Sequence, residues 1–230
     1  MMDELVWNGR VPIQVSAGGQ KRVFLAKRQS YFPLYDAEIS KHFGRVLHLS
    51  ETSLLVDGPP LPWHLPIGVI YDQCRRPILH LHFPAIGSSS TPPVGLEEVA
   101  MAFYGRLKEA DALSADSLGP KVLPNLPQLQ HAALFDTLVT DDLKKYNENV
   151  PQFSLKRIPI RLLVAGGGFA KANTTEQTKP SDSWKTVKGQ VDEVFKDILV
   201  QGIYINSPVK AIDLYSNLRH PDGFLYIIQI

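Results

Sequence analysis

The chain has 230 residues, is 44% hydrophobic and carries a formal net charge of +1, which provides no general attraction to nucleic acid or to an anionic membrane. Its single cysteine, Cys74, excludes an intramolecular disulfide and suits a reducing compartment. No apolar run reaches the roughly 18 residues of a transmembrane helix, and the N-terminus lacks a secretory signal, so we expect a soluble, cytoplasmic protein that does not bind nucleic acid.

The first third of the chain alternates apolar and polar residues in the way that β-strands do. In chain order we predict a strand over 5–16, a glycine turn over 17–20, a strand over 22–28, a helix over 34–46, and strands over 53–57 and 78–83. Apolar side chains on both faces of residues 22–28 predict a strand that is covered on both sides. Pro62 and Pro66 prevent a regular helix at the start of the apolar run 61–74. This order of elements is that of a ubiquitin-like β-grasp.

The middle of the chain reads as helical. After a serine- and proline-rich loop at 87–93, apolar residues spaced by three and four predict a helix over 96–113. The prolines of 114–127 exclude a continued helix, and a second helix is predicted over 128–146.

The last third repeats the first in kind but not in residue identity. We predict a strand over 158–164, a weak strand within 166–180, a helix over 186–199, a strand over 202–205, a helical turn over 214–218 and a strand over 224–230. The predicted fold class is therefore α+β. Two ubiquitin-like β-grasp domains, at 1–86 and 151–230, flank a helix-rich domain at 87–150.

Six segments resemble the autophagy protein 5 family, and a short fungal-type member in particular. They occur in the family's order: VWNGRVPIQV at 6–15, SYFPLYDAEISKHF at 30–43, LPWHLPIGVIYD at 61–72, PILHLHFP at 77–84, LKEADAL at 107–113 and HPDGFLYI at 220–227. The resemblance covers most of the chain and agrees with the predicted domain order.

The resemblance implies a non-catalytic scaffold without cofactor or metal. A lysine would be joined by an isopeptide bond to the ubiquitin-like autophagy protein 12, with the conjugation enzymes of that pathway as transient partners. The conjugate would bind the N-terminal helix of autophagy protein 16 and promote lipidation of autophagy protein 8. It would act in the cytoplasm and peripherally at the preautophagosomal membrane.

The resemblance assigns the acceptor role to Lys121. In the family the acceptor follows the helix that LKEADAL resembles, and Lys121 is the only lysine between Lys108 and Lys144. Glycine and prolines around it keep the backbone out of a helix and at the surface, where a bulky conjugating enzyme can reach the amine. Composition alone would indicate only a solvated loop lysine.

Three aromatic residues around a proline, Tyr31, Phe32 and Tyr35, are candidate contacts for the partner helix. The alternative is internal packing against the helix that follows. Four basic residues are a candidate membrane patch, with a solvated face as the alternative. They are Lys144, Lys145, Lys156 and Arg157.

The sequence is compatible with two other functions. Cys74 with His64, His80 or His82 could form a hydrolase or a metal site, but the spacing matches no known ligand pattern and favours structural roles. The chain could also be a ubiquitin-fold interaction module of another pathway, which would carry no modifier on Lys121.

Overall fold

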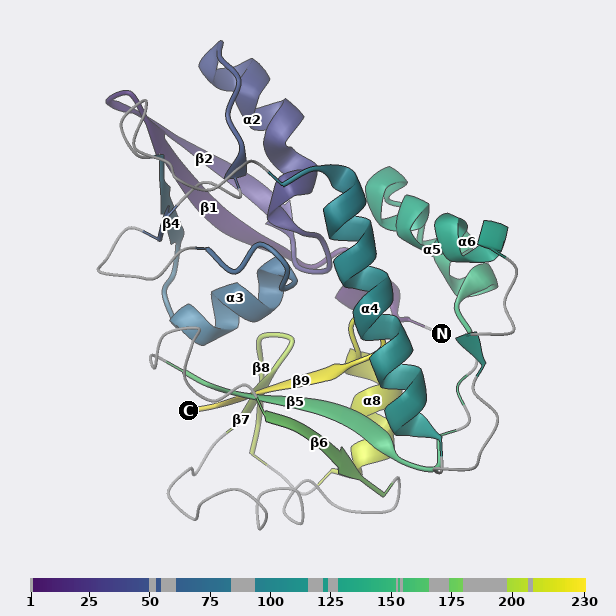
Figure 1. Cartoon of the computed structure of the whole chain (residues 1–230). Coiled ribbons are helices and arrows are strands. Elements are labelled where there is room, and N and C mark those ends of the chain that lie inside the picture. Colours follow the sequence, from purple (N-terminus) through teal and green to yellow (C-terminus); the bar gives the residue numbers. More distant parts are fainter. Residues whose placement is uncertain are drawn as a thin grey trace.

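The computed structural model of the chain contains two β-sheets with a helical unit beside them (Figure 1). It describes residues 2–49, 53–54, 61–83, 94–115, 122–123, 128–151, 153, 155–165, 174–179, 198–206 and 209–230. Lys121 and most of the predicted helix over 186–199 lie outside the described residues.

The first sheet has the strand order β2-β1-β4-β3, with β1 and β4 parallel and the other pairs antiparallel. Its strands are β1 (Arg10–Ala17), β2 (Gln20–Lys27), β3 (Ser53–Leu54) and β4 (Leu79–His82). The helical elements around it are α1 (Glu4–Trp7), the 3-10 helix η1 (Phe32–Tyr35), α2 (Asp36–Phe43) and α3 (Ile67–Cys74). A central parallel pair with antiparallel neighbours is the pairing of a β-grasp.

The hairpin between β1 and β2 is confirmed, because Gly18 and Gly19 have φ of 56° and 82° and Ala17 pairs with Gln20. The prediction of a strand from residue 5 is wrong. The Asp3 carboxylate accepts the Leu5 N–H at 2.8 Å and caps the short helix α1, so the strand begins only at Arg10.

The prediction that β2 is covered on both sides is also wrong. Val23 and Leu25 are 57% and 62% exposed, whereas Ala26 on the opposite face is buried. The core of this domain covers one face of β2 only.

The helical unit consists of α4 (Leu96–Ser114), α5 (Gln128–Thr140) and α6 (Leu143–Asn149). The single helix predicted over 128–146 is divided in two. Asp141 has a φ of 61°, which ends α5, and the Asp142 carboxylate accepts the Lys145 N–H at 2.9 Å to begin α6.

The second sheet has the order β6-β5-β9-β7-β8, with β5 and β9 parallel. Its elements are β5 (Ile158–Val164), β6 (Thr174–Thr178), β7 (Ile198–Val200), β8 (Ile203–Ile205), α8 (Ala211–Leu218) and β9 (Leu225–Gln229). Ile198 and Leu199 belong to β7 rather than to a helix, because they pair with Gln229 and Ile228 of β9. The predicted α+β fold class with two β-grasp sheets is confirmed. The exact domain boundaries stay a prediction.

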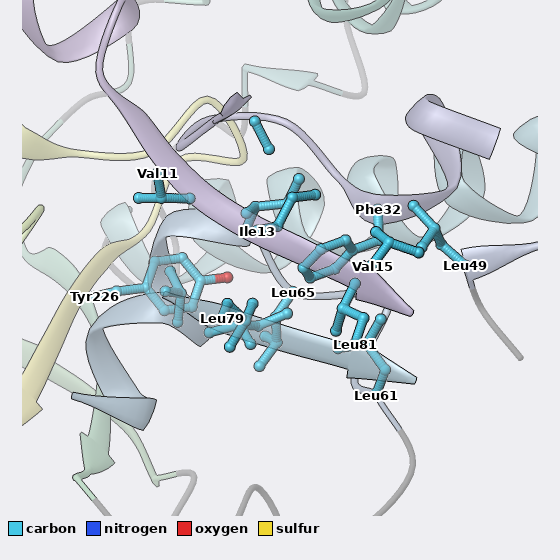
Figure 2. Close-up of a cluster of buried hydrophobic side chains, with 14 of the residues drawn as sticks. Val11, Ile13, Val15, Phe32, Leu49, Leu61, Leu65, Leu79, Leu81 and Tyr226 are labelled. Carbon is cyan, nitrogen blue, oxygen red and sulfur yellow. The ribbon is translucent and has the colours of Figure 1, made fainter. Parts of the chain in front are cut away.

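The two domains share one hydrophobic core. Leu163, Tyr226 and Ile228 of the second sheet join the cluster that contains Val11 and Ile13 of β1 (Figure 2). The opposite face of the second sheet packs on α8 through a separate cluster. The central strands β5 and β9 are therefore buried on both faces, and one of those faces lies against the first domain.

Candidate functional site

A pocket of about 150 Å³ lies between the two β-grasp domains. Its walls come from segments far apart in the sequence: Leu5, Val6, Gly9 and Arg28 from the first domain, and Gln201 and Ile203 from the β7–β8 hairpin of the second. We call this pocket and its rim the interdomain groove. It exists only because the two domains pack together.

The rim of the interdomain groove is apolar and exposed. Leu5 is 85% exposed and Ile203 48%, and Tyr204 next to Ile203 is 57% exposed. The helix α1 is fixed from its other side, since Trp7 is buried and its indole N–H donates to the Asp141 carboxylate at 2.8 Å. An exposed apolar rim around a preformed pocket is typical of a surface that binds a partner.

The floor of the groove is held by a buried ion pair between Arg28 and Asp72. The Gly202 N–H donates to the same Asp72 carboxylate at 2.9 Å, which ties the β7–β8 turn to the first domain. Gly202 has a φ of 79°, and a Cβ there would lie 3.1 Å from Arg28 Nη1. Burial raises the pKa of Asp72, although Arg28 and the hydrogen bonds oppose that shift.

Arg106 of α4 connects the helical unit to both domains. Its guanidinium donates to the His64 carbonyl oxygen in the first domain and lies 3.7 Å from the Asp222 carboxylate in the second. Asp222 also accepts the Tyr226 hydroxyl at 2.7 Å. Arg106 and Asp222 are both buried, so this junction fixes the relative placement of the three units that surround it.

The three aromatic residues predicted as partner contacts do not line the groove. Tyr31 and Phe32 are 1% and 0% exposed, so they pack internally, as in the alternative that the sequence allowed. Tyr35 is half-buried against the first core, and its hydroxyl accepts the Lys27 N–H at 2.8 Å. Pro33 stands at the start of η1 and is buried together with Phe32.

The sequence did not predict the residues of the interdomain groove, because the local patterns that mark them are short. Asp3 followed by an acidic residue and an apolar triplet is a helix-cap signal that would have turned Leu5 away from Trp7. The glycine turn before Ile203 is a hairpin signal that would have exposed the next residues. Neither signal could show that the two segments meet.

The chain on the C-terminal side of Lys121 is anchored to α4. The backbone N–H groups of Val122 and Leu123 donate to the two oxygens of the Asp111 carboxylate, at 3.2 and 2.9 Å. Leu123 is buried. The position that directly follows Lys121 is therefore fixed beside the C-terminal half of α4.

The four basic residues predicted as one membrane patch occupy two separate places. Lys144 and Lys145 are exposed on α6, where Lys145 pairs with Asp136 at 3.7 Å. Lys156 and Arg157 are exposed before β5, and their backbone N–H groups donate to the Ser114 carbonyl at the end of α4. Figure 1 shows α6 well away from the start of β5.

Burial disfavours catalysis by Cys74. Burial raises the pKa of this half-buried thiol to about 11, so the reactive thiolate is scarce near neutral pH. Within the described part of the chain, His, Cys, Asp and Glu residues form no group of three that could hold a metal ion. No helix in that part is both long and apolar enough to cross a membrane.

Family models match both β-grasp domains. The model of the autophagy protein ATG5 UblA domain matches residues 6–91, and the model of the ATG5 UblB domain matches residues 157–228. The chain belongs to the autophagy protein 5 family. The resemblance noted in the sequence is thereby confirmed, and membership supports a role in autophagy.

Similar proteins come from several kingdoms. Autophagy-related protein 5 of Caenorhabditis elegans is 25% identical, and the match covers 98% of this chain and 96% of that protein. Autophagy protein 5 of Debaryomyces hansenii is 20% identical over 98% and 93%, and that of Arabidopsis thaliana is 28% identical over 65% and 49%. These relatives are named as autophagy proteins rather than as enzymes. The fungal type stays a prediction.

A solved structure supports the fold. The crystal structure of Kluyveromyces marxianus Atg5 superimposes with a TM-score of 0.77 at 15% sequence identity, covering 99% of this chain and 98% of that one. At this identity the likeness concerns the arrangement of the elements.

Proposed function

We propose that this protein is a non-catalytic autophagy scaffold. Lys121 accepts autophagy protein 12 through an isopeptide bond, and the interdomain groove holds the N-terminal helix of autophagy protein 16. The conjugate then promotes lipidation of autophagy protein 8. The observation that carries this proposal is an apolar groove built jointly by the two domains of a chain that belongs to this family.

The groove suits an amphipathic helix. Leu5 and Ile203 offer exposed apolar surface on opposite walls, against which a helix can bury residues spaced by three and four. The Gly202 N–H of the second domain donates to Asp72, which pairs with Arg28 in the first domain. These contacts hold the two walls together, so little ordering is needed when the helix binds.

The binding role is tested with Ile203→Asp and Leu5→Asp. Each places a carboxylate where the helix would bury apolar side chains, and we expect each to weaken binding of the partner helix at least about tenfold. Val23→Asp is the matched control, because it changes an equally exposed apolar residue outside the groove. Unchanged affinity in both groove variants, measured by calorimetry, would show that the helix binds elsewhere.

The acceptor role of Lys121 rests on the family resemblance, and the anchored residues that follow it support the proposal. Hydrogen bonds to Asp111 hold Val122 and Leu123, the two residues that follow Lys121, beside α4. The reference pKa of lysine is about 10.4, so the conjugating enzyme must supply deprotonation of the attacking amine. Arginine keeps the charge but stays protonated and is a poor nucleophile. We therefore expect Lys121→Arg to abolish the modifier's added mass on a gel while leaving partner-helix binding unchanged.

We also place the conjugate in the cytoplasm and peripherally at the preautophagosomal membrane. A basic residue near an anionic surface contributes about 1 kcal/mol, so the separate pairs Lys144–Lys145 and Lys156–Arg157 would each bind weakly. Sedimentation with phosphatidylserine vesicles distinguishes them. The double variant Lys156→Glu and Arg157→Glu should reduce vesicle binding if the C-terminal end of α4 faces the membrane. The double variant Lys144→Glu and Lys145→Glu should reduce it if α6 faces the membrane.

A further inference from the structure

The outer edge of β2 presents unpaired backbone groups. β2 is the first strand in the order β2-β1-β4-β3, and its closing pair with β1 is Ala17 with Gln20. In such a hairpin alternate residues bond to the partner strand, and the residues between them point their N–H and C=O outward. On β2 the outward-pointing residues are Lys21, Val23, Leu25 and Lys27.

One contact confirms this direction. The Lys27 N–H donates outward to the Tyr35 hydroxyl, so η1 covers the C-terminal end of the edge. Across the described ranges, no further backbone bond satisfies the outward groups of Lys21, Val23 and Leu25. The open edge therefore extends over 21–25.

Beyond Lys21 and Arg22, the exposed side chains of this edge are apolar. Val23 and Leu25 project from the same face and are more than half exposed. Proteins guard such edges with prolines, bulges or charged side chains. The segment KRVFL carries charges only at its start, and its end from Val23 to Leu25 has neither charge nor proline. An exposed apolar edge of this kind can add a strand from a partner, which gains backbone hydrogen bonds and alternate side-chain contacts.

The charges beside the edge define the chemistry of the partner. Lys21 and Arg22 are exposed, and the Arg45 guanidinium lies beside the hairpin, 3.6 Å from where a Cβ on Gly18 would stand. None of these three cations makes an ion pair within the part of the chain that the structure describes. β2 itself contains no acidic residue.

We propose that residues 21–25 bind an extended segment of a partner protein by β-strand addition. The segment has alternating apolar residues that contact Val23 and Leu25, and acidic residues beside Lys21 and Arg22. A second copy of this chain is a poorer occupant, since its own β2 brings no carboxylate to these cations. This site is independent of the interdomain groove and goes beyond the proposed function.

A synthetic peptide tests the proposal on the full-length protein. The labelled probe has about eight residues, acidic at one end and then alternating leucine or valine with threonine. We expect it to bind at least about tenfold more tightly than a scrambled peptide and than the same sequence with alternate backbone nitrogens methylated. Methylation removes the donors of strand pairing and keeps every side chain. Equal binding of the methylated and unmodified peptides overturns the proposal.

Variants of the edge locate the contact. Val23→Pro removes an outward N–H without removing a bond to β1, and an edge position tolerates proline there. It should weaken binding of the peptide at least about tenfold. Val23→Thr keeps the N–H and nearly the same shape and should weaken binding much less, and the groove variant Ile203→Asp should leave it unchanged. If Val23→Pro keeps the wild-type melting temperature and the wild-type affinity, the edge is not the site. If it does not fold, the methylated peptide on the wild-type protein decides.

Two further measurements define the occupant. Charge reversal at Lys21 and Arg22 should weaken binding of the acidic peptide at least about tenfold. An unchanged affinity would contradict the proposal that the partner segment is acidic. Sedimentation should find the wild-type protein monomeric. Self-association that Val23→Pro abolishes would make a second copy the occupant and overturn the proposal.

Discussion

The two β-grasp sheets have the same central parallel pair, yet their strands meet very different surroundings. Every residue of β9 is buried, because one face packs on α8 and the other joins the core of the first domain. On β2 the first four residues are exposed, and only one face meets a core. The comparison shows that one topology can serve as an internal wall in one domain and as a binding surface in the other.

The sequences of the two strands explain the difference. LYIIQ in β9 is apolar without alternation, as expected of a strand buried on both faces. QKRVFLAK in β2 combines three cations with apolar residues on both faces. Apolar residues on both faces predict two-sided burial only where another layer is present to cover them.

The largest effect on stability is expected at Arg106, which connects the helical unit to both β-grasp domains. Arg106→Met leaves the buried Asp222 carboxylate without its cation, and loss of one partner of a buried pair costs about 3–5 kcal/mol of stability. Urea unfolding measures the change. Arg106→Lys keeps the charge and should cost less, and equal losses in both variants would mean that the charge is unimportant.

A matched pair tests the difference between the two strands directly. Ile228→Ala in β9 removes buried apolar volume from the shared core and should cost about 3 kcal/mol. Leu25→Ala in β2 removes an exposed side chain and should change the free energy of unfolding by no more than about 0.5 kcal/mol. Similar losses in the two variants would show that β2 is covered in solution.

A smaller effect concerns pH. Burial, helped by Arg28 and Arg106, lowers the pKa of His220 well below its ordinary value. The folded protein keeps this ring neutral, whereas the unfolded chain protonates it below about pH 6.5, so its contribution to stability is lost as the pH falls.

His220→Gln should therefore flatten the decline in stability between about pH 6.5 and about pH 5.5, by about 1 kcal/mol. The difference between variant and wild type isolates this ring from Asp72 and Asp222, whose raised pKa values act in the opposite direction. Urea unfolding at the two pH values measures it. An unchanged slope would mean that the ring is not buried as described.

Much of the fold could be predicted from the sequence because local patterns determine its elements. The two glycines of the first hairpin, the apolar spacing of α4 and the closing strands of both domains were sufficient. The wrong predictions can be traced to single residues. Asp3 caps α1 where a strand was predicted, and Asp141 with Asp142 separates α5 from α6 where one helix was predicted.

The candidate site was less accessible, because it depends on long-range packing. The residue types of Tyr31 and Phe32 suit a partner contact as well as a core position, and only the tertiary structure shows that they are buried. Leu5 and Ile203 lie almost the whole chain apart and meet through the buried Arg28–Asp72 pair with Gly202. No local pattern could have placed them on one groove.

The most direct test of the proposed scaffold role is mass spectrometry of the conjugate. The protein is conjugated to autophagy protein 12 by its cognate enzymes, digested, and searched for branched peptides. We predict a branch at Lys121, beside the anchor that Asp111 provides for Val122 and Leu123. A branch at Lys108 or Lys144 with none at Lys121 would contradict the account.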